Sequence, residues 1–160
     1  MWDPCWLDDR TVAWGNLRGD GSAVWTVDLD SRRVASLPGS LGMMGAKCSR
    51  EGAIVAARSW TQGYWLYRPA TGWQDLGVPS DLWYPNFSRD GSAIYGLSLD
   101  ERAIFRFRIG ERRRERVADL GTIEPTAPWH EVWMGLDPDD APLILRNTGF
   151  SDLFVLEWGP

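Results

Sequence analysis

The chain has 160 residues, of which 44% are hydrophobic and 24% charged, a balance that excludes a disordered or fibrous protein. Its formal net charge of -5 gives no overall attraction to nucleic acid or to an anionic membrane surface. The 11 Trp, 17 Gly and 10 Pro favour many short strands and turns over long helices. A chain of this length is expected to form one domain.

The first residues resemble neither an export signal nor a membrane anchor. No apolar run approaches the ~20 residues that a membrane helix requires, and Met1 is followed by Trp-Asp-Pro-Cys-Trp instead of basic and apolar regions. We therefore expect no membrane span. The sequence leaves the localisation open: we expect a cytoplasmic protein from the chain as encoded, and a periplasmic one if it is natively the C-terminal part of an anchored sensor.

The two cysteines, Cys5 and Cys48, are too few for a disulfide scaffold and lack the close spacing of a metal or redox motif. We expect both to be small buried hydrophobic residues.

In chain order, four turn-like segments each precede a short apolar stretch. Their acidic residues lie 42, 39 and 49 positions apart and are Asp9, Glu51, Asp90 and Asp139. About fifteen residues after each turn comes a second apolar stretch that alternates as a strand does. The aromatic residues that lead these stretches lie 40, 40 and 49 positions apart and are Trp25, Trp65, Phe105 and Phe154. Two independent markers therefore indicate one repeat of about 40 residues.

Each repeat contains two further short segments that complete a unit of four strands. A third stretch follows in three repeats, at 33–37, 73–76 and 116–120, and a fourth precedes the next turn, at 43–46, 83–87 and 131–135. A four-stranded unit of about 40 residues is typical of a β-propeller blade, and a β-sandwich is the alternative. The sequence predicts an all-β, partial β-propeller of about four blades of four antiparallel strands, the last incomplete. These blades span approximately 2–37, 42–76, 83–120 and 131–158.

The repeats resemble those of TolB-type β-propellers, whose pattern is an aromatic or proline, Ser-Pro-Asp-Gly, a strand, a hairpin and an aromatic-led strand. The clearest copy runs from Tyr84 to Tyr95, and the resemblance covers nearly the whole chain. Arg50 and Arg89 replace the usual proline, Glu51 replaces Asp, and Arg10 and Asp140 replace the turn glycine.

The last repeat is similar to the C-terminal end of TolB-like propellers in bacterial winged-helix regulators or eukaryotic-like serine/threonine kinases. That resemblance implies a sensory or interaction module within a larger signalling or regulatory protein. Closed propellers commonly have 4 to 8 blades, so we expect residues 1–160 to be a fragment of a ring of about six to eight blades. A very small ring with an open seam is the alternative. Pairing of two copies into a larger ring is a testable consequence for the isolated fragment.

Catalytic and metal-binding chemistry has little support. The single histidine, His130, has no accompanying Gly-x-Ser-x-Gly motif, and no calcium loop or zinc ligand set is recognisable. We therefore assign no catalytic residue, metal or cofactor. The alternative function is a propeller hydrolase, glycosidase- or peptidase-associated, and a glycosidase would use paired carboxylates.

An arginine-rich segment also has a structural explanation. Seven arginines lie between Arg102 and Arg116, but glutamates are interleaved with them and two alternate with aromatic residues. We expect a solvated blade edge that discourages strand pairing, and no direct contact with nucleic acid.

Loops that join the outer strand of one blade to the inner strand of the next line one end of a propeller channel. The candidate ligand-binding residues there are Trp83, Tyr84, Trp129, His130 and Trp133, which could stack on a sugar ring or a peptide. For any single tryptophan, packing between blades is the competing interpretation. We predict a non-catalytic module that binds a protein partner or a small ligand, including a carbohydrate, at this loop face.

Overall fold

The computed structural model describes residues 4–15, 22–58, 62–79, 81–111, 113–123 and 133–146. Within these residues the chain forms strands and turns only. Three antiparallel sheets contain four strands each, in sequence order from one edge to the other, and a fourth sheet contains two. We call these sheets blades 1 to 4.

The strands have the following bounds. Blade 1 contains β1 (Cys5–Trp6), β2 (Thr11–Gly15), β3 (Val24–Asp28) and β4 (Val34–Ser36). Blade 2 contains β5 (Met44–Cys48), β6 (Ile54–Ala57), β7 (Tyr64–Arg68) and β8 (Gly72–Val78). Blade 3 contains β9 (Leu82–Phe87), β10 (Ala93–Ser98), β11 (Ala103–Arg108) and β12 (Arg114–Asp119). Blade 4 contains β13 (Met134–Leu136) and β14 (Pro142–Ile144).

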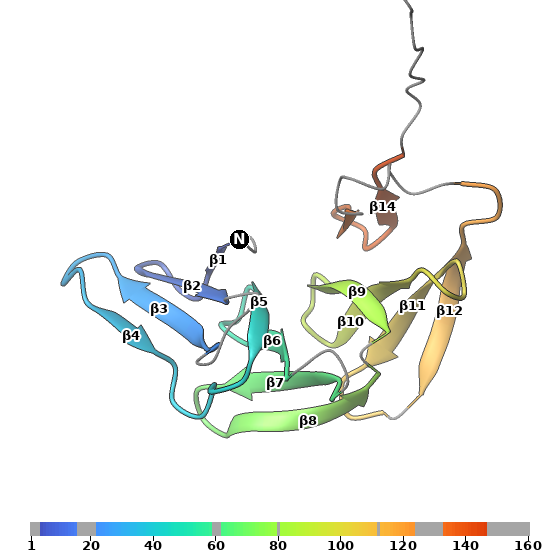
Figure 1. Cartoon of the computed structure of the whole chain (residues 1–160). Coiled ribbons are helices and arrows are strands. Elements are labelled where there is room, and N and C mark those ends of the chain that lie inside the picture. The colour runs from blue at the N-terminus through green and yellow to red at the C-terminus, as the bar shows by residue number, and fades with distance from the viewer. Residues whose placement is uncertain are drawn as a thin grey trace, which may run out of the picture.

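The blades follow one another along an open arc, with β1, β5 and β9 on its concave side and β4, β8 and β12 on its rim (Figure 1). This arrangement is a partial β-propeller, which confirms the predicted fold class. The predicted last strand of blade 4, led by Phe154, lies outside the described residues. None of the described segments forms a helix long and apolar enough to span a membrane.

Three apolar cores lie between successive blades. Ala13 and Val24 of blade 1 share a core with Ile54 and Ala56 of blade 2, while Val55 lies in the core that joins blade 2 to blade 3. Because successive side chains of a strand point to opposite faces, one short strand contributes to two cores. A third core joins blade 3 to Met134 and its neighbours in blade 4. The predicted packing of each blade on its neighbour therefore accounts for most of the buried apolar side chains.

The turn before the second strand of each blade is fixed by side-chain hydrogen bonds. In blade 3 the Ser88 hydroxyl donates to Asp90 Oδ1 at 2.7 Å, and it accepts a hydrogen bond from the Ala93 backbone N–H at 2.9 Å. Gly91 has a φ of 67°, a conformation that glycine adopts without steric cost. The segment from Ser88 to Gly91 is therefore a turn, as predicted.

The innermost strands of blades 2 and 3 contain equivalent irregularities. The register of β5 shifts between Met44 and Lys47, and that of β9 shifts opposite Tyr95 and Leu97. Gly45 has a φ of 60° in the first shift. A Cβ on the neighbouring Gly15 would lie 2.6 Å from the Gly45 backbone, so these two strands approach more closely than side chains permit.

The prediction for the cysteines was wrong. Cys5 in β1 and Cys48 in β5 form a disulfide across 43 residues of sequence, with their Cα atoms 5.5 Å apart. Both residues are half-buried, and the bond joins the innermost strands of blades 1 and 2. Sequence spacing gave no sign of this pairing because it depends on how one blade packs against the next.

Candidate functional site

Two clefts lie between the turns that precede the second strand of each blade. The first, of about 240 Å³, lies between the inner ends of blades 2, 3 and 4. The second, of about 570 Å³, lies between the turns of blades 1 and 2. Arg50 lines both clefts, as do Cys48 and Ser49. We call these two clefts together the turn-face site.

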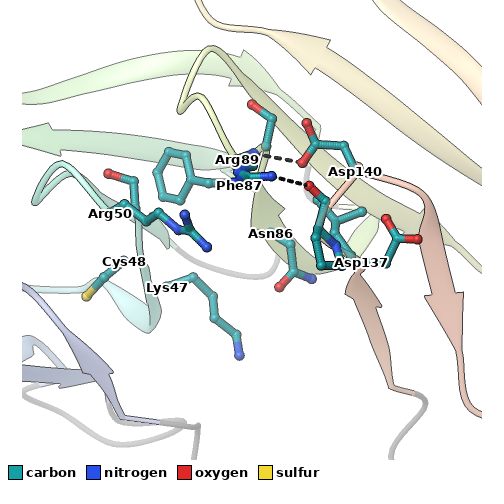
Figure 2. Close-up of a pocket in the computed structure, with 12 residues that line it drawn as sticks. Lys47, Cys48, Arg50, Asn86, Phe87, Arg89, Asp137 and Asp140 are labelled. Atoms are coloured by element: carbon teal, nitrogen blue, oxygen red, sulfur yellow. Dashed lines mark hydrogen bonds between the residues drawn. The ribbon is translucent and has the colours of Figure 1, made fainter.

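Arg89 is held in place by the turn of the next blade. Its backbone N–H donates to Asp140 Oδ1 at 2.7 Å, and its Nη1 donates to the Pro138 carbonyl oxygen at 3.2 Å (Figure 2). Proline, the residue expected here from the TolB-like pattern, has no N–H and could make neither bond. The replacement of proline by arginine therefore adds a polar contact between blades 3 and 4.

Arg50 occupies the same position in blade 2 and is not held in this way. Its guanidinium forms no ion pair with the residues that the structure describes, and its side chain extends from the turn toward the middle of the first cleft (Figure 2). A guanidinium carries several N–H donors in a planar fork that suits a carboxylate or phosphate. Arg50 is thus the residue of the site best placed to contact a ligand.

The nearby carboxylates are engaged in their own turns. Asp137 Oδ1 accepts hydrogen bonds from the backbone N–H groups of Asp139 and Ala141, at 2.9 and 2.8 Å. Asp8 Oδ1 accepts from the backbone N–H groups of Arg10 and Thr11, at 2.9 and 2.8 Å. The Arg10 hydrogen bond contributes most to holding the pKa of the Asp8 carboxyl below its usual value. These acids stabilise the turns on either side of Arg50.

Asn86 joins the innermost strands of blades 3 and 4 beneath the first cleft. Its side-chain amide donates to the carbonyl oxygens of Tyr84 and Met134, at 2.8 and 3.0 Å. Both bonds use the Nδ2 group, so the amide is fixed between two strands. Asn86 therefore ties these two strands together where it lines the first cleft.

The predicted loop-face residues are only partly described. Trp83 and Trp133 are 37% and 43% exposed, whereas Tyr84 is buried in the core between blades 3 and 4. Trp129 and His130 lie outside the described residues. The binding role of this set therefore stays a prediction.

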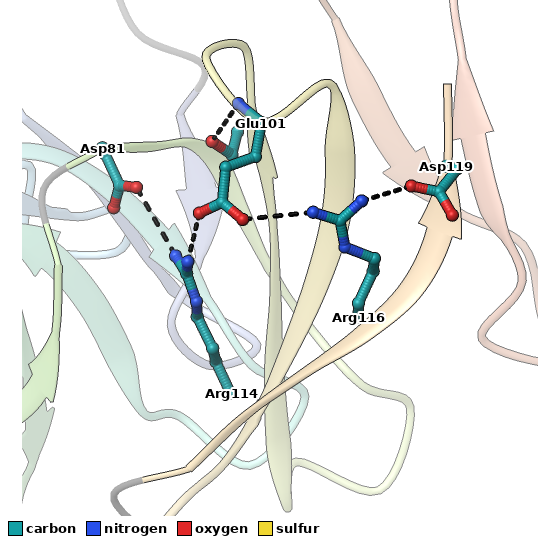
Figure 3. Close-up of polar contacts among 6 residues, drawn as sticks. Asp81, Glu101, Arg114, Arg116 and Asp119 are labelled. Atoms are coloured by element: carbon teal, nitrogen blue, oxygen red, sulfur yellow. Dashed lines mark hydrogen bonds and ion pairs between the residues drawn. The ribbon is translucent and has the colours of Figure 1, made fainter. Parts of the chain in front are cut away.

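The arginine-rich segment forms an ion-pair network on the outer strand of blade 3. Arg114 contacts both Glu101 and Asp81, the latter at 3.6 Å, and Arg116 contacts Glu101 at 3.2 Å and also Asp119 (Figure 3). The Arg114 guanidinium also lies over the Phe105 ring, 4.3 Å from its centroid. These contacts neutralise much of the positive charge on the strand.

Within the described residues, no three His, Cys, Asp or Glu side chains are grouped to hold a metal ion. Sequence reasoning missed the turn-face site because it treated the Ser-x-Asp-Gly turns as structural. The available signal was the replacement of proline by arginine at positions 50 and 89, which introduces two cations at repeat-equivalent places.

The comparisons with known proteins support the fold. No protein-family model and no curated protein matches this sequence. Among solved structures, the chain is similar to the crystal structure of TolB from Acinetobacter baumannii, with a TM-score of 0.53 and 14% sequence identity. The match covers 69% of this chain and 30% of that TolB chain, so this chain spans less than a third of it. The described part of the chain has a TolB-like β-propeller fold.

Proposed function

We propose that this chain is a non-catalytic β-propeller module that binds an acidic segment of a protein partner at the turn-face site. The observation that carries the proposal is Arg50, which lines two adjoining clefts and has no ion-pair partner among the described residues. In contrast, the neighbouring Arg89 is held by Pro138 and Asp140. An arginine that the fold leaves unpaired in a cleft suits a carboxylate of a bound peptide.

The module belongs, in this proposal, to a larger signalling or regulatory protein, as the resemblance to propellers of winged-helix regulators and eukaryotic-like kinases implies. The two clefts together are lined by the turns of four successive blades, so a bound segment would contact several blades at once. Affinity would then come from the shape of the clefts as well as from Arg50. The loop face with Trp83 and Trp133 is the competing binding surface.

The test uses two fluorescent peptide pools of equal length, one rich in Asp and Glu and one in which Asn and Gln replace them. We expect the full chain to bind the acidic pool more tightly, as measured by fluorescence anisotropy. Arg50→Gln should weaken that binding roughly tenfold or more, the effect of losing about 1.4 kcal/mol or more of binding free energy.

Arg33→Gln is the matched control, since Arg33 is an exposed arginine that lines neither cleft. Equal binding of both pools, or equal effects of the two substitutions, would exclude Arg50 as the anchor. Loss of binding in Trp83→Ala with no change in Arg50→Gln would place the ligand at the loop face instead.

A further inference from the structure

The interfaces inside the arc join two different kinds of blade face. One, the leading face, packs on the preceding blade: Ile54 and Ala56 of blade 2 lie in the core shared with blade 1. The opposite one, the trailing face, packs on the following blade: Val55 lies in a core with Ile94 and Phe107 of blade 3. Every described junction therefore places a trailing face against a leading face.

Blade 1 has a leading face on which no described strand packs. Ala13 points into the core with blade 2, so its neighbours Val12 and Trp14 point the other way. Cross-strand partners share a face, and one row on this face runs across all four strands. The row consists of Trp6, Val12, Val27 and Val34. Its end members are well exposed, Trp6 by 60% and Val34 by 57%.

No described strand packs on the trailing face of blade 4 either. Ile144 packs against the core shared with blade 3, so the residues on either side of it point away from that core. These two residues are Leu143 and Leu145, and they are 45% and 53% exposed. Leu143 pairs with Gly135 next to the turn, as Val55 pairs with Lys47 in blade 2.

The two faces on which none of the described strands packs are thus of opposite kinds and lie at opposite ends of the arc (Figure 1). A leading face fits a trailing face at each of the inner junctions, so each end of the chain carries the surface that the other end of an identical chain requires. We propose that two copies of this chain associate head to tail, with blade 4 of each packing on blade 1 of the other.

Such a contact uses different patches on the two partners, and contacts of this kind close into a ring when the rotation between copies permits. Two copies joined at both ends close into a ring if the second contact repeats the rotation of the first. Both apolar faces are then buried in the same way as the three cores within the chain. In a longer chain, additional blades would cover the same faces; the proposal concerns residues 1–160 by themselves.

The experiment measures the mass of the full chain by light scattering across a wide range of concentrations. We expect a species of twice the chain mass of 18.1 kDa. Val27→Lys on the leading face and Leu143→Glu on the trailing face should each shift the protein to the single-chain mass. Val27 and Leu143 occupy the places of Phe107 and Val55, which lie in one core, so the two new charges should meet when the variants are mixed. The mixture should therefore recover the doubled mass.

Leu41→Glu is the matched control, because Leu41 is 74% exposed and lies between β4 and β5, away from both faces. It should keep the doubled mass. Circular dichroism checks that each variant is folded. If Val27→Lys does not fold, Val34→Lys replaces it on the leading face, and if Leu143→Glu does not fold, Leu145→Glu replaces it on the trailing face. A single-chain mass for the unmodified protein at all concentrations would overturn the proposal. A failure of the mixed variants to associate would also overturn it, because a leading face packed on a trailing face brings the new Lys and Glu side chains together.

Discussion

At the scale of single residues, the most informative position is Arg89, where arginine replaces the proline of the TolB-like turn. Arg89→Pro restores the usual pattern but removes the backbone donor to Asp140 and the side-chain donor to Pro138. We expect the free energy of unfolding to fall by about 2 kcal/mol, since each of the two hydrogen bonds contributes about 1 kcal/mol net. Urea denaturation measures it. Arg50 at the equivalent turn makes neither contact, so Arg50→Pro should lower the free energy of unfolding less. Equal losses of stability in the two variants would contradict this account.

Asp90 provides a second prediction at the same scale. The backbone N–H of Ser92 and the hydroxyl groups of Ser88 and Ser92 lower the pKa of its carboxyl from 3.8 to about 2. A carboxyl whose pKa is lower in the folded state stabilises the fold above its unfolded pKa, and this contribution is lost as the pH falls. Asp90 should therefore stabilise the protein above about pH 4 and lose that effect toward pH 2.

Asp90→Asn should accordingly show a smaller drop in its urea midpoint between pH 4 and pH 2 than the unmodified chain. A remaining drop is expected, because hydrogen bonds also lower the pKa of the Asp8 and Asp28 carboxyls. Asp100→Asn is the control, since no hydrogen bond to its carboxylate is found among the described residues, and it should keep the full drop. Identical acid profiles for the two variants would contradict the assignment.

At the scale of elements, the disulfide compensates for a weakly anchored strand. β1 is two residues long and pairs with β2 only through Cys5 with Ala13 and Trp6 with Val12. The Cys5–Cys48 bond ties it to β5 of the next blade. The entropy of closing a loop of 43 residues sets an upper value of roughly 4 kcal/mol for this stabilisation.

We therefore expect a reductant to lower the melting temperature of the unmodified protein. The double variant Cys5→Ser/Cys48→Ser should melt at the lower temperature with or without reductant. Thermal unfolding and titration of free thiols measure the two effects. Free thiols in the unreduced protein, or the same melting temperature with and without reductant, would show that the Cys5–Cys48 disulfide does not form.

The elements themselves were largely predictable from the sequence. The turn residues at Glu51 and Asp90 and the aromatic residues at Trp65 and Phe105 repeat with one period, and β6, β7, β10 and β11 lie where that period places them. Local chemistry sufficed because a Ser-x-Asp-Gly turn and an alternating strand are each determined by neighbouring residues. The disulfide and the clefts were not predictable, since they depend on the offset between adjacent blades.

At the scale of the whole molecule, burial is concentrated in the middle of the arc. All six residues of β10 are buried, because its two faces pack on blades 2 and 4, whereas all three residues of β4 at the edge of blade 1 are exposed. In an array of repeats, each unit is stabilised by its nearest neighbours, so an end unit with one neighbour opens most easily. The open arc therefore implies a gradient of stability from blade 3 toward blade 1.

Hydrogen exchange followed by mass spectrometry tests this gradient and its link to the head-to-tail dimer. In dilute protein we expect β10 amides to exchange slowest and those of β2, β3 and β14 much faster. As the concentration rises, pairing should slow exchange in blades 1 and 4 and leave β10 unchanged, because only the end blades gain a neighbour. Val27→Lys alone should keep the fast end-blade exchange at high concentration. Uniform protection at every concentration would instead mean that the chain closes its own ends.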